Sequence, residues 1–214
     1  MTDYLTLSAF KADYPASEFG LGSTDYDPSL TSLLTTASRL VDKELGKWEN
    51  YFYPSTDTEN RYYDGTGGNT VYIDDAVSIS AVAVSESGGL ASSDYTAWSS
   101  SDYITHPYNT TPIYKLIVDR LNGSKLYWYP YRKAVKVTGI FGHSATPPDL
   151  VVQAIKVQVS RWHMRQKQMW QDTNNQELGA VVVNVNGKNF IGTKLDPDVA
   201  AMLHPYKIAG LGDE

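Results

Sequence analysis

The hydrophobic pattern of this 214-residue chain changes its period twice along the sequence. Apolar residues recur at three- and four-residue spacing near both ends, which predicts helices. They alternate with period two through the middle, which predicts strands. Neither pattern can adopt the other structure without exposing its apolar face. The order helix, sheet, helix therefore predicts an α+β fold in which a helical core carries a β insertion.

The N-terminal region contains the clearest amphipathic helix of the sequence. Residues 8–14 predict a short helix that ends before Pro15. Asp27 and Pro28 then begin a longer helix over 28–45, since aspartate can cap a helix and proline suits its first position. Its apolar residues at helical spacing are Leu30, Leu33, Leu34, Ala37, Leu40, Val41 and Leu45.

Short alternating runs between residues 60 and 142 predict an antiparallel sheet or small sandwich. Gly65, Gly67 and Gly68 separate the runs 59–64 and 69–74, which predicts a hairpin of these two strands. Further strands are expected at 77–85, 101–106, 113–118, 125–130 and 134–142.

The C-terminal region returns to the helical period. A long helix is expected from Leu150 to about Trp170, and Asp196-Pro197 begins a short one that ends near Leu203. Asn186-Gly187 predicts a second hairpin between them. We expect the two long helices to pack together through Leu34, Leu40, Ile155 and Trp162.

Together these elements predict a small helical bundle, with two long amphipathic helices and short terminal helices, that carries an inserted antiparallel β region. The predicted organisation is a single domain over 1–206, with a helical core from 1–58 and 147–206, the β insertion at about 59–146, the second hairpin at about 178–193 and an extended tail at 207–214.

Composition narrows the function classes. The chain has no cysteine, which excludes disulfide scaffolds, thiolate zinc sites and thiol nucleophiles. A net charge of −6 argues against wholesale wrapping of nucleic acid. The 16 Tyr and 5 Trp against 5 Phe are typical of half-wet interfaces and also of tyrosine-rich β-structure. The N-terminus lacks the pattern of a secretory signal, and no apolar run is long enough to span a bilayer.

No segment has the residues of a complete active site. The sequence around His143 and Ser144 lacks the final glycine of a nucleophile elbow, and the glycine-rich loop after Asp64 lacks the lysine of a phosphate-binding loop. Asp74 and Asp75 are adjacent on a strand and point to opposite faces. We therefore predict no catalytic residue, no metal ligand and no cofactor, and a non-enzymatic protein.

Basic side chains gather on the long C-terminal helix, which has no acidic residue between Leu150 and Trp170. This pattern fits a solvated helix face, or a basic face toward DNA or an acidic partner. The residues concerned are Lys156, Arg161, His163, Arg165 and Lys167.

In their order along the chain, these segments resemble the head-to-tail connector family of tailed bacteriophages, also called adaptor or head-completion proteins. Residues 37–42 and the aromatic-proline exit at 51–54 are similar to one segment of that family. The segment VKVTGIFGHSATPPDLVVQAIKVQVSRWHMR matches another, with its strand, Gly-aromatic-Gly turn, proline, Asp and long helix. The remaining matches are YLTLSAFKADYP, RYYDGTGGNTVYIDDAVSISAVAV and DPDVAAMLHPYK.

The resemblance implies a structural neck protein of the virion, assembled in the host cytoplasm. Its copies would form a ring, usually a dodecamer, that docks on the portal protein and extends the channel for packaged double-stranded DNA. The ring would also offer a platform for the head-closure, stopper or tail protein. Connector C-termini commonly reach the portal, which implies portal contacts at Tyr206, Lys207, Ile208 and Leu211.

Two other functions remain open from the sequence. One is a carbohydrate-binding β module of a phage or surface accessory protein, which would need exposed coplanar rings such as Tyr127, Trp128 and Tyr129. The other is a hydrolase whose carboxylates converge from distant segments. The helices at both ends favour the connector, because a sugar-binding module has little use for them.

Overall fold

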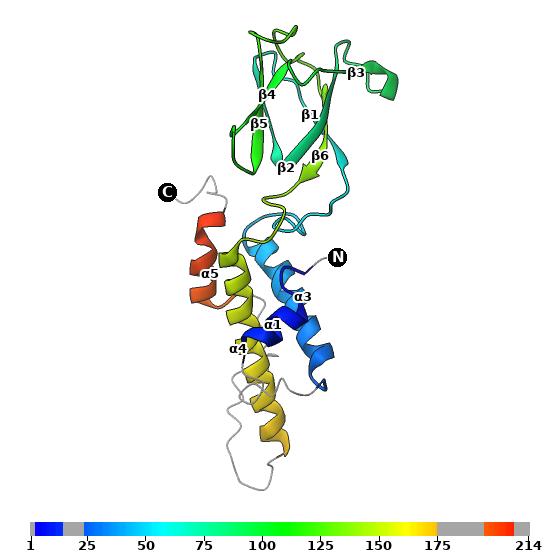
Figure 1. The fold of residues 1–214 in the computed structure, drawn as a ribbon. Coiled ribbons are helices and arrows are strands. Elements are labelled where there is room, and N and C mark those ends of the chain that lie inside the picture. The colour runs from blue at the N-terminus through cyan, green and yellow to red at the C-terminus, as the bar shows by residue number, and fades with distance from the viewer. Residues whose placement is uncertain (1–2, 15–23, 175–194, 208–214) are drawn as a thin grey trace. The chain divides into compact units, whose positions relative to one another are not determined.

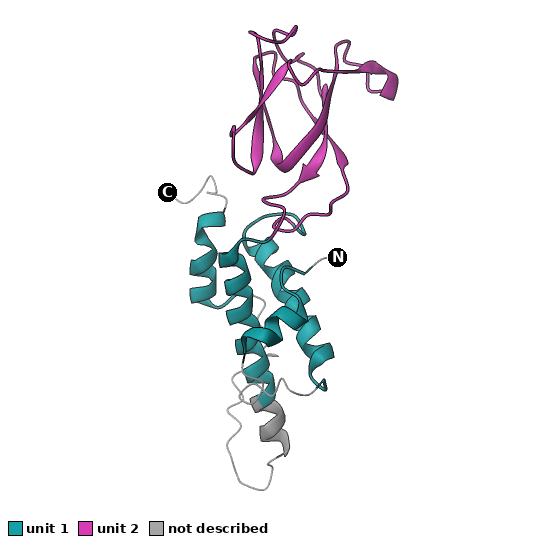
Figure 2. Ribbon diagram, in the orientation of Figure 1, with its two compact units in different colours: residues 1, 3–50, 147–214 teal, residues 2, 51–146 magenta. Residues whose placement is uncertain are grey.

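The computed structural model describes residues 3–14, 24–174 and 195–207 of the chain, without the side chains of 168–174. Two compact units make up the protein, coloured separately in Figure 2. We call residues 3–50 and 147–214 the helical unit and residues 51–146 the β unit. The expected hairpin at 178–193 falls outside the described residues.

The elements appear in Figure 1 with the labels used below. The helices are α1 (Leu7–Asp13), α3 (Asp27–Glu44), α4 (Asp149–Asn174) and α5 (Pro197–Leu203), with short 3-10 turns at Ser92–Asp94 and His204–Tyr206. The strands are β1 (Glu59–Tyr63), β2 (Thr70–Ser85), β3 (Tyr95–Ala97), β4 (Tyr103–His106), β5 (Ile113–Val118) and β6 (Val135–Phe141).

Apolar faces of the helices form the core of the helical unit. α4 packs against both α3 and α5, and α1 packs against α3. Leu34 and Ile155 are buried, as predicted, and the exposed fraction of Trp162 is 1%. The spacing of these residues follows the helical period, so one face of each helix enters the core.

The N-terminal segment before α1 is held on α3 by polar contacts. The Tyr4 amide donates to Ser38 Oγ at 3.2 Å, and the Tyr4 hydroxyl donates to the Asp42 carboxylate. The Asn50 amide and the Arg39 guanidinium also reach this carboxylate, at 3.1 and 3.3 Å. Burial nevertheless raises the pKa of Asp42 to about 6, because removing the carboxylate from water disfavours its charged form.

The β unit contains one antiparallel sheet in the order β1-β6-β2-β5-β4. β2 is the long central strand. It pairs with β5 over its first half and with β6 from Ala76 onward, and β3 pairs with its far end. Bulges interrupt both long ladders, which lets β2 bend between its two sets of partners.

The predicted hairpin of 59–64 with 69–74 is wrong, because β1 pairs with β6 rather than with β2. The intervening loop binds a different segment of the chain. Gly65 N donates to Tyr131 O at 2.9 Å, and Gly67 N donates to Trp128 O at 2.8 Å. A Cβ on Gly65 would lie 1.7 Å from Tyr129 O, so only glycine allows this approach.

The strand expected at 125–130 is also absent from the described structure. Its alternating aromatic pattern belongs to a loop in which Trp128 is fully buried and stacks on Trp98, with ring centroids 4.5 Å apart. The runs 69–74 and 77–85, expected as two strands, form the single strand β2. The alternation of aromatic residues in 125–130 therefore reflects the burial of Trp128 in a loop, and not a strand paired in the sheet.

The predicted fold class is wrong. The sequence predicts a small helical bundle with strands inserted into it, whereas the six-stranded antiparallel sheet forms a compact unit of its own. Inward residues of the sheet such as Val82, Leu116 and Val137 are buried within that unit. Sequence period identifies such strands, but it does not reveal that their apolar faces bury one another and make a separate core.

Candidate functional site

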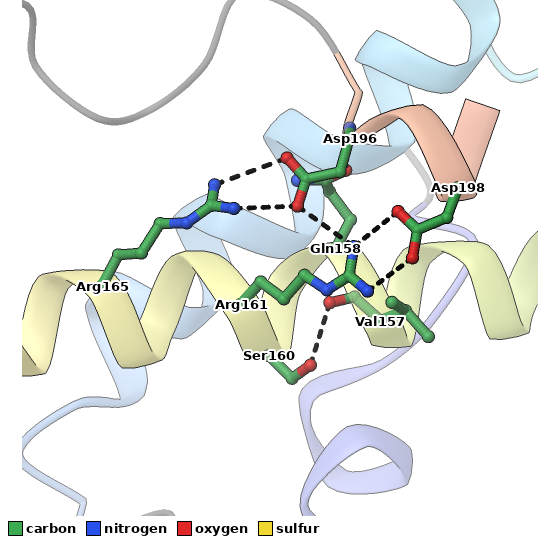
Figure 3. Close-up of polar contacts among 7 residues, drawn as sticks. All are labelled: Val157, Gln158, Ser160, Arg161, Arg165, Asp196 and Asp198. Carbon is green, nitrogen blue, oxygen red and sulfur yellow. Dashed lines mark hydrogen bonds and ion pairs between the residues drawn. The ribbon is translucent and has the colours of Figure 1, made fainter.

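Within the described residues of the helical unit, a cluster of four charged side chains joins α4 to the start of α5 (Figure 3). Arg161 makes a two-point contact with the Asp198 carboxylate at 2.6 and 2.5 Å, and its Nη1 also reaches Asp196 at 3.2 Å. Arg165 binds Asp196 through both guanidinium Nη atoms, at 3.4 and 2.9 Å. Two-point Arg–carboxylate contacts fix geometry as well as charge. We call these four residues the α4–α5 clamp.

Electrostatics within the clamp favour the ionised carboxylates. The hydrogen bonds from Arg161 hold the pKa of Asp198 at about 2. Burial works against ionisation of Asp196, yet the hydrogen bonds from Arg165 and Arg161 still lower its pKa. Gln158 adds a neutral contact, since its Oε1 accepts the Asp196 amide at 2.8 Å. The clamp therefore fixes α5 on α4 with full charges at ordinary pH.

Other members of the expected basic face also have contacts inside the helical unit. Lys156 forms a salt bridge with Asp13 of α1. His163 is 1% exposed, with its ring edge against Tyr26, so it cannot face a partner. Lys167 is half-buried. The carboxylates that meet Lys156, Arg161 and Arg165 thus belong to this chain, and a contact of this face with DNA or an acidic partner stays a prediction.

The residues weighed as catalytic or metal-binding have structural contacts. His143 Nδ1 lies 3.1 Å from the neighbouring Ser144 Oγ, which donates to Thr146 O at 2.7 Å. Asp64 accepts the Lys133 amide at 2.8 Å. Asp74 accepts from Arg61 at 2.9 Å and from Tyr63 at 3.1 Å. Within the described ranges, no group of three or more His, Asp or Glu is arranged to hold a metal ion.

The expected portal contacts lie at the end of the described chain. Tyr206 closes the 3-10 turn after α5, and Lys207 is exposed. Ile208 and Leu211 fall outside the described residues. No helix in the described part of the chain is both long and apolar enough to cross a membrane.

Large exposed apolar side chains mark the β unit, a feature that composition suggested but could not locate. Every such side chain among the described residues belongs to this unit. Leu121 is 94% exposed and Tyr72 is 68% exposed. The set is Tyr62, Tyr72, Leu90, Tyr108, Tyr114, Leu121, Leu126, Tyr127 and Tyr131.

A search of protein-family models finds no match, and a search of curated proteins finds none. Among solved structures, the chain is similar to one in the neck of an empty gene transfer agent (GTA) particle computed with C6 symmetry, with a TM-score of 0.49 and 15% identity over 99% of this chain and 97% of that one. A chain in the virion of a native GTA particle has a TM-score of 0.49 and 14% identity, again over 99% and 97%. A third, in the neck of a native GTA particle computed with C12 symmetry, has a TM-score of 0.47 and 14% identity over the same shares.

Proposed function

We propose that this chain is a structural, non-enzymatic subunit of the neck of a tailed virus-like particle, in which its copies form a ring. The observation that carries the proposal is that the exposed large apolar side chains of the described chain belong to one of its two units. All those found in the described chain lie on the β unit, and six of the nine are tyrosines. Tyrosine is enriched at protein interfaces because one ring supplies both apolar area and a hydrogen-bonding hydroxyl.

The helical unit supports the same proposal in a different way. Within this unit, salt bridges join Lys156 to Asp13 and connect the four charged residues of the α4–α5 clamp. Such a unit has a fixed shape, which a repeating subunit needs so that every copy presents the same surfaces. The co-linear resemblance to head-to-tail connectors supports a neck as the assembly that this subunit joins.

The finer parts of the proposal come from that resemblance. The ring, a dodecamer, would dock on the portal protein and extend the channel through which packaged double-stranded DNA passes without sequence recognition. It would also carry the head-closure, stopper or tail protein. The segment from Tyr206 onward, with Lys207, Ile208 and Leu211, would lie extended in a groove of the portal.

The carbohydrate-binding alternative loses its proposed platform in this structure. Trp128 is fully buried, stacked on Trp98, and cannot meet a sugar. The rings of Tyr127 and Tyr129 are tilted by 59° to one another, whereas a sugar platform needs coplanar exposed rings.

Deletion of the gene from a particle-producing strain tests the proposal. Electron microscopy should then show DNA-containing heads that lack tails, and the wild-type gene should restore complete particles. Ser144→Ala should restore them equally well, because the Ser144 hydroxyl has local structural contacts, with its neighbour His143 and with the Thr146 carbonyl. Complete, infectious or transfer-competent particles without the chain would refute the proposal.

A further inference from the structure

The β unit has a cluster of cations at the start of β6, the strand that pairs with β1. Arg132 and Lys133 are exposed in the loop before β6, and Lys136 follows on β6 itself. In the part of the chain that the structure describes, no salt bridge joins any of the three to a carboxylate. We call Arg132, Lys133 and Lys136 the basic patch.

Half-exposed tyrosines border the basic patch and fix its loop. Tyr62 of β1 lies directly opposite Lys136 in the ladder, and its ring meets that of Tyr95 at 5.7 Å. The Tyr95 hydroxyl donates to Lys133 O at 2.8 Å, and Lys133 has a left-handed backbone with φ of 52°. Non-glycine residues adopt this conformation infrequently, and the hydrogen bond from Tyr95 holds the backbone that carries Arg132 and Lys133 at this place.

Carboxylates beside the basic patch are occupied by backbone amides. Asp64 accepts the Lys133 amide at 2.8 Å, and Asp94 accepts the Ala91 amide at 2.8 Å. They reduce the local positive charge but form no salt bridge with the patch in the described chain. The basic patch is therefore left with charge to offer a partner.

Carboxylates gather around Arg61 of β1. Arg61 lies between Glu59 and Asp74, with contacts of 2.8 and 2.9 Å. One cation thus meets two carboxylates that are about half exposed. Asp57 adds a third, exposed carboxylate two residues before Glu59. We call Asp57, Glu59 and Asp74 the acidic patch.

The pleat of β1 separates the two patches. Successive residues of a strand point to opposite faces, so Tyr62 faces the side of the basic patch and Arg61 faces the side of the acidic patch. The register agrees, since Tyr62 pairs with the half-buried Lys136 and Arg61 pairs with the fully buried Val137. β1 ends the sheet order, and at this edge the carboxylates of Glu59 and Asp74 stay about half exposed although Arg61 lies on the inward side of the sheet.

From this arrangement we propose that the basic patch of one copy of the chain contacts the acidic patch of the next copy. Two different surfaces then meet at each contact, so the association is head-to-tail, and a suitable rotation closes it into a ring. The tyrosines beside the basic patch supply the apolar area that a contact of charges alone would lack. The inference rests on the proposed ring and names the surfaces that would build it.

The geometry favours a second copy over nucleic acid as the partner. Both halves of a complementary contact are present on one molecule, and the whole chain has a net charge of −6, which repels a polyanion. The acidic patch of a second copy has three carboxylates and one nearby cation, Arg61. It therefore keeps a net negative charge that can meet the basic patch. Binding of duplex DNA to the basic patch is the competing outcome of the test below.

Charge reversal tests the contact with the full-length chain by sedimentation velocity. The basic-reversed variant carries Arg132→Glu and Lys136→Glu, and the acid-reversed variant carries Asp57→Lys and Glu59→Lys. Each alone should weaken self-association by about tenfold or more, because it sets like charges against each other. An equimolar mixture should regain most of the wild-type association, since every contact then joins opposite charges.

Controls separate the contact from general effects of charge. Lys43→Glu with Lys47→Glu makes the same change in net charge as the basic-reversed variant, in the helical unit and outside both patches, and should associate as wild type does. Asp57→Lys alone covers the case in which Glu59→Lys disturbs folding, because the side-chain contact of Asp57 is with Ser55. Raising NaCl to about 0.5 M should weaken wild-type association, since exposed charges are screened.

Three results would overturn the inference: a wild-type chain that stays monomeric at low salt, reversed variants that associate as wild type does, or a mixture that fails to recover. Loss of duplex DNA binding in the basic-reversed variant, with self-association intact, would overturn it in favour of a phosphate-binding surface. If gene deletion removes tails while the reversed variants still assemble, only this inference fails. If the charge exchange works but particles form without the chain, only the proposed function fails.

Discussion

In the helical unit, carboxylates of α5 and α1 hold the cations of α4, whereas in the β unit three neighbouring cations have no salt bridge within the described chain. The two units also differ in how far their large apolar side chains are exposed. No large apolar side chain described in the helical unit is among the exposed ones, while in the β unit Tyr72 is 68% exposed and Leu121 is 94% exposed. The helical unit pairs cations of α4 with its own carboxylates, whereas the β unit exposes cations and apolar side chains that a partner can contact.

This difference indicates that the helical unit mainly contributes to the stability of the fold, and that the β unit mainly contributes to association with other molecules. Exposed tyrosines cost little when solvated, yet they provide much of the energy when an interface buries them. Internal ion pairs add modest stability but fix how two helices meet. Substitutions in the helical unit should therefore change folding, and substitutions on the β-unit surface should change association.

The largest expected effect is that of Trp162→Ala in the helical unit. Trp162 is 1% exposed on the face of α4 that enters the core. Truncation removes a large buried ring and leaves a cavity, which should lower the free energy of unfolding by about 3–5 kcal/mol. Urea denaturation followed by far-UV circular dichroism measures the change.

The matched variant lies in the β unit. Tyr72→Ala removes a large ring that is 68% exposed and should change the free energy of unfolding by less than about 0.5 kcal/mol. If the two substitutions lower the free energy of unfolding equally, the proposed difference between the helical unit and the surface of the β unit is wrong.

A second effect concerns pH and Asp42. Its folded pKa of about 6 lies above the ordinary value of 3.8, so the folded state binds this proton more tightly than the unfolded state. The carboxyl group contributes its full stability below about pH 4, and that contribution is lost as the pH rises toward 6. The total loss should be about 2–3 kcal/mol. Unfolding free energies at a series of pH values between 4 and 7 measure it.

Asp42→Asn is the control, because an amide of the same shape cannot titrate. Its stability should vary less across this pH range than that of the wild type. Asp196 and Asp198 have lowered pKa values and act in the opposite sense, losing stability as the pH falls below about 4. A wild-type curve that rises from pH 4 to 6 would show that Asp42 is not buried in its protonated form.

The sequence locates the helices and most of the strands because period and capping residues are local signals. Asp27-Pro28 and Asp196-Pro197 mark the starts of α3 and α5 to within a residue. The basic residues of α4 are also visible in the sequence. Their partners Asp196 and Asp198 are not recognisable as such, because the two segments lie more than 30 residues apart and the sequence shows them only as helix-start residues.

Strand pairing is where sequence reasoning fails. The turn glycines at 65–68 predict a hairpin, but the bonds of this loop go to residues 128–131, and β6 takes the place beside β1. Such pairing depends on contacts between distant segments, which a local pattern cannot rank. The basic and acidic patches depend on this pairing, since Tyr62 meets Lys136 only across the β1–β6 ladder.

A smaller loss than those expected from Trp162→Ala and from the titration of Asp42 should come from Asp196→Ala in the α4–α5 clamp. The side chain of Asp196 is 17% exposed, but its partners Arg161 and Arg165 are 38% and 40% exposed, so water screens part of the attraction. We expect a loss of about 1–2 kcal/mol in the free energy of unfolding. The difference from wild type should shrink at high salt.

A double-mutant cycle of Arg165→Gln and Asp196→Asn gives the interaction energy of the pair without the change in side-chain size. Coupling of about 0.5–1 kcal/mol would agree with a clamp that fixes α5 on α4. Coupling near zero would mean that the salt bridge contributes nothing to folding. The cations of α4 would then be as open to a partner as those of the basic patch, and the contrast between the two units would no longer include their charges.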